Sequence, residues 1–202
     1  MTKQLNKRAL MWTILIISLL QMPQFAILPA TDLIWRDAFP ELALQTVQTA
    51  MTLPGFFAVI AGVAASLLVR YGLAAKKTMT VVGLAMIALS GVTAMILNTH
   101  FWHLCLMNIL IGSGMGIFVP SSQSIMFDNF DEKTRQFITG VQFSCINGGG
   151  LIMSIMCGIL MTIAWYGGYL QMLVAIPVVI VALVIIPKDK KMKFNTAAEG
   201  SL

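Results

Sequence analysis

One stretch of the chain decides its fold: Asn108-Ile-Leu-Ile-Gly112-Ser-Gly114-Met-Gly116-Ile-Phe-Val-Pro120-Ser-Ser-Gln123. It lies inside a run, residues 101–126, that contains no Asp, Glu, Lys or Arg. About 20 residues of helix cross the hydrocarbon core of a bilayer, so this run is long enough to span a membrane. A helix that contacts only lipid needs no glycines at alternate positions and no amide or hydroxyl side chains. The stretch therefore predicts a spanning helix that packs closely on its neighbours and lines a cavity.

The composition extends this interpretation to the whole chain. Of 202 residues, 58% are hydrophobic and only 10% are charged, whereas water-soluble domains carry about 25% charged residues. Cys105, Cys145 and Cys157 lie in separate apolar runs, so we expect packing residues and neither disulfides nor metal ligands. The sequence holds no catalytic triad, carboxylate pair, phosphate loop or metal motif. We therefore expect a membrane protein that is not an enzyme and has no cofactor and no metal.

Hydropathy and charge together predict the topology. The pattern gives six spans, at residues 9–30, 43–69, 78–97, 101–126, 137–163 and 168–187. If the N-terminus is cytoplasmic, twelve Lys and Arg residues lie on the cytoplasmic side and only Arg36 lies outside. This excess predicts cytoplasmic N- and C-termini, and it explains the basic pI without nucleic acid. The basic segment 1–8 resembles the start of a signal peptide, but no small-residue cleavage site follows, so we expect a retained first helix.

The C-terminal segment 188–202 is basic and then rich in Ala, Gly and Ser. We expect a flexible cytoplasmic tail or the start of a linker, with its lysines near anionic lipid headgroups.

A weak internal repeat divides the bundle into two halves. Ala26-Ile-Leu-Pro-Ala-Thr-Asp32 is similar to Ile117-Phe-Val-Pro-Ser-Ser-Gln123 at an offset of 91 residues, and the same offset carries span 78–97 onto residues 169–188, which is the sixth span. Because each repeat has three helices, the two lie in opposite orientations in the membrane. This predicts inverted repeats at about residues 9–97 and 101–187, as in many secondary transporters.

Polar side chains gather on the first and second span of each repeat, while the third spans are nearly all apolar. Ser18, Gln21 and Gln24 are spaced by three residues, which places them on one helical face. The candidate substrate-binding residues are Gln21, Gln24, Asn108, Ser113, Gln123 and Asn147. The alternative is that these side chains form hydrogen bonds between helices, each worth about 0.6 kcal/mol.

Small residues predict where helices pack closely. The candidates are Gly112, Gly114, Gly116 and Pro120 in the fourth span and the ladder Gly150, Ser154 and Gly158 in the fifth. Small side chains let two helix backbones approach each other, which both stable packing and a rocking helix pair require.

Four motifs together resemble a known family. Ile27-Leu-Pro29 closes the first span, and Leu53-Pro-Gly55 is followed by Arg70-Tyr-Gly72 and Lys76-Lys77. The glycine-rich stretch 112–120 and the loop 130–135 complete the set. Over about residues 9–190 the chain resembles the N-terminal six-helix half of the major facilitator superfamily, and its first motif resembles the drug-exporter branches. The resemblance implies an all-α bundle of two inverted repeats, a gating loop at Arg70, Gly72, Lys76 and Lys77, and substrate bound between two bundles.

The chain departs from the family pattern at several positions. Val69 replaces the acidic residue of the gating loop, Leu73-Ala74 replaces its basic pair, and Asn108 replaces the arginine of the fourth helix. The antiporter Gly-Pro motif of the fifth helix is Cys157-Gly158 here. No charged residue lies well inside a span, which argues against proton coupling through this bundle.

We therefore expect a secondary active transporter of a small solute, with export of drugs or hydrophobic compounds as the class that the resemblance implies. We expect it in the plasma membrane, that is, the inner membrane of a bacterium. A lone bundle would expose polar helices to lipid, so we expect a second six-helix bundle, either another copy or the C-terminal half of a longer chain. The alternative is a non-transporting scaffold or partner subunit, which the altered loop and the lost arginine favour and the clustered polar residues oppose.

Overall fold

The computed structural model describes residues 2–187, so the predictions for the tail 188–202 lie outside the described residues. The described chain is helical, with six segments long and apolar enough to cross a membrane. These segments are Lys7–Ala38, Leu44–Arg70, Lys76–Ile96, Phe101–Asn129, Glu132–Met161 and Gly167–Ile185. All six predicted spans are confirmed as helical segments. The first extends eight residues beyond its predicted end, and the fifth begins five residues early.

The segments are built from nine α-helices and two 3₁₀ turns in the described chain. The first contains α1 (Thr2–Ser18), α2 (Pro23–Ile27), a 3₁₀ turn (Leu28–Ala30) and α3 (Thr31–Ala38). The next four are single helices: α4 (Leu44–Arg70), α5 (Lys76–Ile96), α6 (Phe101–Asn129) and α7 (Glu132–Met161). The last contains α8 (Gly167–Leu170), a 3₁₀ turn (Gln171–Val174) and α9 (Ala175–Ile185).

The first segment is broken, which the sequence analysis did not predict. Pro23 has no backbone N–H and cannot donate to the carbonyl of Leu19, so a continuous helix cannot pass through this position. The chain instead makes shorter turns, in which Leu19 N donates to Ile16 O and Gln21 N donates to Ser18 O. The expectation that Ser18, Gln21 and Gln24 share one helical face is therefore wrong, because α1 ends at Ser18.

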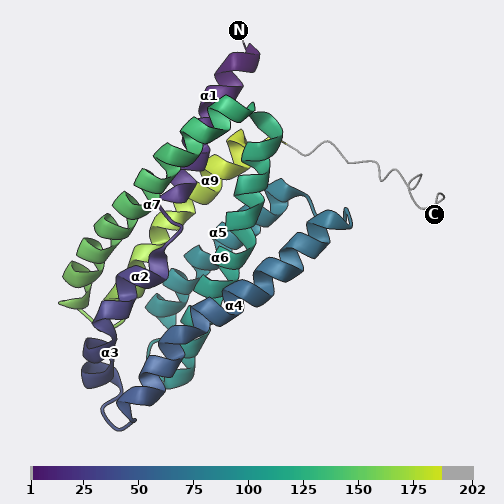
Figure 1. Ribbon diagram of the computed structural model, residues 1–202. Helices are drawn as coiled ribbons and strands as arrows, with labels where there is room; N and C mark the ends of the chain where they lie inside the picture. Colours follow the sequence, from purple (N-terminus) through teal and green to yellow (C-terminus); the bar gives the residue numbers. More distant parts are fainter. Residues whose placement is uncertain (1, 188–202) are drawn as a thin grey trace.

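The helix contacts follow the two repeats (Figure 1). The middle helix of the first repeat, α4, packs on α6, which begins the second repeat. The middle helix of the second repeat, α7, packs on α1 and α2, which begin the first. The last helices of the two repeats, α5 and α9, contact each other. The middle helix of each three-helix repeat thus packs on the first segment of the other repeat.

The alternate glycines of α6 serve two different neighbours. Residues two apart on a helix point about 200° apart, so glycines at positions 112, 114 and 116 divide between opposite faces. A Cβ at Gly112 would lie 2.2 Å from Pro54 O, and one at Gly116 would lie 2.1 Å from Ala58 O, both on α4. On the other face, a Cβ at Gly114 would lie 2.6 Å from Gly83 O of α5. The backbone of α6 is therefore packed closely between two helices.

Candidate functional site

The helices α4 and α7 leave most of their surface uncovered by the described bundle. Only 11% of the apolar centre of α4 and 17% of that of α7 are buried, against 50% for α6. A transmembrane helix in this state faces either lipid or another protein surface. The residues on each face decide between these two environments.

On α7 the exposed residues lie on two faces, one with small and polar residues between which the exposed Phe143 and Leu151 also lie, and the other with apolar residues alone. We call the first the small-polar stripe, which consists of Gln136, Gly140, Asn147, Ser154 and Gly158. The second is the apolar stripe, which consists of Phe137, Ile152, Ile155 and Ile159. The apolar stripe suits lipid, whereas amide and hydroxyl groups are unfavourable there. The small-polar stripe therefore requires a partner surface or a water-filled path.

The exposed face of α4 has the same division. Gln48, Thr52, Gly55 and Ser66 are exposed along one line, which also carries the exposed Val59, and Phe56, Ile60, Val63 and Leu67 are exposed beside it. Next to the first line lies a groove of about 600 Å³ between α4 and α6. Gly62 of α4 and Gly116 and Pro120 of α6 are among its lining residues, so small residues on both helices contribute to this surface.

The six candidate substrate-binding residues divide equally between the surface and the interior. Gln24 is partly exposed, and Gln123 and Asn147 are exposed. Asn147 Nδ2 donates to Phe143 O of its own helix at 2.8 Å. Gln21, Asn108 and Ser113 are instead buried in the bundle. Three of the six candidates can therefore meet a solute without rearrangement of the bundle.

Asn108 takes part in a buried polar cluster that links three helices. Its Nδ2 donates to Tyr169 Oη of α8 and to Leu104 O of α6, each at 3.0 Å. Tyr169 Oη in turn donates to Met51 Sδ of α4 at 3.5 Å. This geometry favours the hydrogen-bonding interpretation of Asn108 over the substrate-binding one. Tyr169 is not among the candidates from the sequence, because its only signal there is a polar aromatic at the start of an apolar span.

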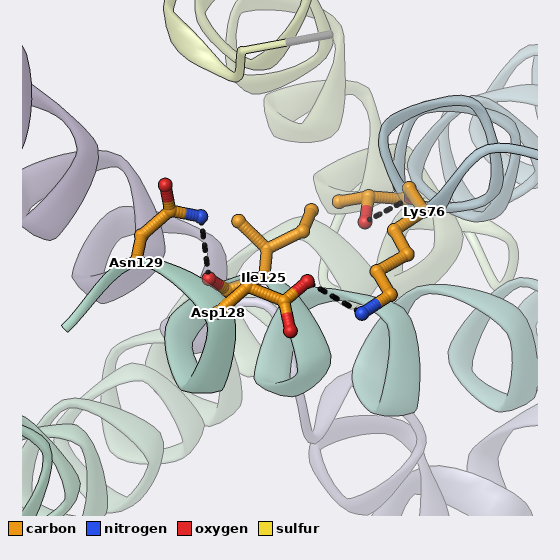
Figure 2. A network of polar contacts seen from close by, with 5 residues as sticks. Lys76, Ile125, Asp128 and Asn129 are labelled. Carbon is orange, nitrogen blue, oxygen red and sulfur yellow. Dashed lines mark hydrogen bonds and ion pairs between the residues drawn. The ribbon is translucent and has the colours of Figure 1, made fainter. Parts of the chain in front are cut away.

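An ion pair joins two helices at the end of the bundle that carries α1's N-terminus and most of the basic residues, which we call the basic end. Lys76 Nζ, at the start of α5, lies 2.5 Å from Asp128 Oδ2 near the end of α6 (Figure 2). The Lys76 side chain is 9% exposed and that of Asp128 is 54% exposed. Figure 2 also shows Asn129 Nδ2 donating to Ile125 O, a bond of 2.8 Å within the last turns of α6. Lys76 is one of the gating residues expected from the sequence, whereas Asp128 is not among the candidates.

The neighbouring lysine holds a third helix. Lys77 Nζ donates to Leu183 O and Ile186 O, each at 2.6 Å. These carbonyls lie at the C-terminal end of α9, where a positive charge is favourable. The two lysines thus connect the start of α5 to the ends of α6 and α9.

The other two gating-loop residues lie outside these contacts. Gly72 adopts φ +69° directly after α4, a left-handed conformation that favours glycine at a helix C-terminus. Leu73 N and Ala74 N both donate to Leu68 O, which closes this turn. Arg70 is exposed.

The short loop between α6 and α7 is closed by a helix cap. Asp131 Oδ2 accepts from Thr134 N at 3.3 Å, and its Oδ1 accepts from the Thr134 hydroxyl at 2.9 Å. These hydrogen bonds, from the hydroxyl first and then the backbone, lower the pKa of Asp131 below its usual value. The carboxylate therefore stays ionised at neutral pH and caps α7.

The Gly150–Ser154–Gly158 ladder does not pack as expected. A Cβ at Gly150 or Gly158 would meet no other atom within 4 Å, and Ser154 is exposed. The predicted contact with another helix is therefore absent within residues 2–187, because this side of α7 faces away from the bundle. Close packing here requires a partner from outside the described residues.

Two comparisons with known proteins bear on the family of this chain. The sequence model of the Major Facilitator Superfamily matches residues 7–201 of the chain. The comparison with curated proteins gives no match. Among the described residues, no group of His, Cys, Asp or Glu is arranged to hold a metal ion.

Proposed function

Because the chain belongs to the major facilitator superfamily of membrane transporters, we propose that its bundle is one half of a solute path that works by alternating access. In such transporters the substrate binds near the bilayer midplane, between two bundles that rock about it. The described bundle provides one wall of this path, and a second six-helix bundle provides the other. The second bundle is another copy of this chain or a further segment of a longer one.

The observation that carries the proposal is an accessible amide in the middle of a membrane-spanning helix. Asn147 is exposed in the middle of α7, on the small-polar stripe, and Gln24 is partly exposed on α2. Acyl chains offer an amide no hydrogen-bond partner, and the Phe143 carbonyl accepts only one of the hydrogen bonds that Asn147 can form, so we place these faces against a polar path rather than against acyl chains. Uncharged amides suit a neutral solute, and the apolar residues around them suit a hydrophobic one.

The groove between α4 and α6 belongs to the same proposed wall of the solute path, and it is the surface that would pack against the second bundle. Its lining of glycine and apolar side chains fits an apolar helix of the second bundle, since small residues permit close helix contact in membranes.

The lysine contacts at the basic end are the proposed gate. Lys76 with Asp128 and Lys77 with the end of α9 hold three helix ends together. Val69 and Leu73 leave the loop after α4 without the charges that the family pattern has there. The contacts of Lys76 and Lys77 therefore close the basic end in place of those charges. The charge pattern supports a plasma-membrane protein with this end in the cytoplasm.

The test is export of Nile red, a neutral hydrophobic dye, from cells that produce the chain. Gln24→Leu and Asn147→Leu should each lower the export rate at least several-fold while the amount of protein in the membrane stays the same. The matched control is Asn98→Leu, which removes an amide from the turn after α5, outside the proposed path. Export that is equal in all variants and in cells without the protein would contradict transport of this class.

A second candidate function has one observation in its favour. Asn108, which replaces the family's arginine, is bonded to Tyr169 inside the bundle, as expected of a structural element. A scaffold or partner subunit would be indifferent to Gln24→Leu and Asn147→Leu in every transport assay, and it would be retained by its partner after both changes.

A further inference from the structure

An arginine at the basic end has hydrogen-bond donors that no protein group uses. Arg135 is the fourth residue of α7 and is partly buried. Its Nε is enclosed without a partner, whereas its two Nη atoms are accessible and also have no partner within residues 2–187. A guanidinium is always charged and carries N–H donors on both Nη atoms. These donors are therefore free to bind an anion from outside the bundle.

The carboxylates near Arg135 do not neutralise it by contact. Asp131 caps α7 through Thr134, and Asp128 is paired with Lys76. Glu132 precedes Arg135 by three residues, but Arg135 forms no ion pair with any carboxylate in the part of the chain that the structure describes. The positive charge of Arg135 is thus left for another partner.

An aromatic ring holds the guanidinium in place. Arg135 Cζ lies 5.3 Å from the centroid of the Phe127 ring, which belongs to the last turns of α6. This distance is within the range of about 6 Å for a cation–π contact. Phe127 is 54% exposed, so the ring and the cation lie together at the surface. Because the contact restrains the long arginine side chain, a ligand that binds it loses less conformational entropy.

The length of α7 places this pair at the level of the lipid headgroups. The helix has 30 residues, which gives about 45 Å, whereas the hydrocarbon core is about 30 Å thick. A helix centred on the core therefore extends about 7 Å beyond it at each end. Arg135 lies about 5 Å along the axis from the start of α7, so we expect its guanidinium in the headgroup layer.

Two exposed lysines add positive charge to this surface. Lys133 is exposed on α7, and Lys7 is exposed on α1. Lys7 lies near the loop between α6 and α7, because, after the hydrogen bonds of the helix cap, its charge also lowers the pKa of Asp131. The cations here outnumber the exposed carboxylates Asp131 and Glu132. An excess of positive charge at a membrane surface attracts anionic lipids.

We propose that Arg135, held against Phe127, binds the headgroup phosphate of an anionic phospholipid. The Nη donors of a guanidinium bond to two oxygens of one phosphate. Lys7 and Lys133 attract the net negative charge of the headgroup, and the exposed ring of Phe127 contacts the upper part of the acyl chains. The bound lipid thereby covers the junction of α1, α6 and α7 at the basic end. This inference does not depend on the proposed transport activity.

Native mass spectrometry of the full chain, titrated with phosphatidylglycerol, tests the site by measuring the dissociation constant of the tightest bound lipid. Arg135→Gln should weaken this binding at least about five-fold, which is the effect of one basic residue near an anionic surface. The matched control is Arg36→Gln, which changes an exposed arginine of α3 at the opposite end and should bind the lipid as the unchanged protein does. Phosphatidylcholine, whose headgroup has no net charge, should bind more weakly than phosphatidylglycerol.

Two further variants distinguish a built site from general attraction by charge. Arg135→Lys keeps the charge but loses the planar pair of donors, and Phe127→Leu keeps an apolar side chain but loses the ring. Each should weaken the binding of phosphatidylglycerol several-fold while the thermal unfolding midpoint stays the same.

Three results would overturn the proposal. Equal lipid binding by Arg135→Gln and Arg36→Gln would mean that Arg135 does not hold the headgroup. Unchanged binding in both Arg135→Lys and Phe127→Leu would mean that net charge alone attracts the lipid. Displacement of phosphatidylglycerol by an equal concentration of glycerol 3-phosphate, which has the phosphate but no acyl chains, would mean that the surface binds a soluble phosphate and not a lipid.

Discussion

At the scale of single residues, the bundle depends on polar side chains that bond across helices. Asn108 and Tyr169 are 61 residues apart in sequence, yet they are bonded at 3.0 Å in the buried interior. Hydrogen bonds of this kind in membrane proteins average about 0.6 kcal/mol and reach about 1.7 kcal/mol. The contact is therefore expected to contribute measurably to stability, although it involves no charge.

Tyr169→Phe should lower the free energy of unfolding by about 0.6 to 1.7 kcal/mol, because Asn108 and Met51 lose a common partner. Unfolding in mixed micelles measures this change. Tyr71→Phe is the control, since Tyr71 is 63% exposed. Equal stability of the two variants would contradict a structural role for the cluster.

The ion pair at the basic end leads to a second residue-scale prediction. Asp128→Asn should lower stability by about 1 kcal/mol or less, because Asp128 is half-exposed and solvent screens the pair. The effect should shrink in high salt, which a salt series of thermal unfolding measures. Asp37→Asn, at the opposite end, is the control. If both variants lose the same stability, or if salt has no influence, the pair does not hold the helices.

The sequence identified one member of each of these contacts but not the other. Asn108 and Lys76 stand out because a polar or charged group lies beside an apolar run. Tyr169 and Asp128 do not, since their importance depends on which helices become neighbours and how each helix is rotated. For the same reason the hydropathy pattern could not show that Gln21 and Ser113 are buried while Gln123 and Asn147 are exposed.

At the scale of elements, the spacing of glycines determines how α6 packs. Gly112 and Gly116 face α4, and Gly114 faces α5, so a pattern of alternate small residues serves two interfaces. The sequence predicted close packing here without naming the neighbours. It placed the same expectation on the ladder of α7, which faces open space because small residues do not reveal which side of a helix is covered.

Gly112→Ala should destabilise the bundle by at least about 1 to 3 kcal/mol, the cost of overpacking, because the new Cβ would meet the Pro54 backbone. Gly158→Ala is the matched control and should be neutral or stabilising by up to about 1 kcal/mol, since alanine favours helix and the site is open. Thermal unfolding in detergent compares the two. Similar losses from both would contradict the close approach of α6 to α4.

The broken first segment shows what hydropathy alone omits. Residues 9–30 are apolar enough to suggest one helix, but Pro23 and Pro29 lack the N–H groups that a continuous helix requires. The two prolines indicate the break in the first segment, whereas the mean hydropathy of the span does not. The final segment has the same signal, because Pro177 cannot donate to the carbonyl of Leu173, which lies in the 3₁₀ turn Gln171–Val174.

At the scale of the whole molecule, the six helical segments of residues 2–187 form a bundle whose two exposed middle helices, α4 and α7, are equivalent in the repeat. Span number and the two-repeat division were predictable because they follow from hydrophobic run length and from an odd number of helices per repeat. The proposed second bundle would cover the polar and small residues on both helices, which face away from the core. The charge distribution supplies the expected orientation.

The measurement that tests the central claim most directly is cysteine labelling in intact membranes with a small water-soluble maleimide. The background is a variant in which the three native cysteines are replaced by serine. Asn147→Cys and Gly148→Cys are neighbours at the same depth on α7, but Asn147 lies on the small-polar stripe, whereas Gly148 lies one turn before Ile152 on the apolar stripe.

The account predicts rapid labelling at position 147 and also in Gln24→Cys, because these faces line a hydrated solute path, and little labelling at position 148, which faces lipid. Labelling at position 147 that is no faster than at position 148 would contradict the account, because it would mean that both faces of α7 lie in the same environment and that no polar path runs along this bundle.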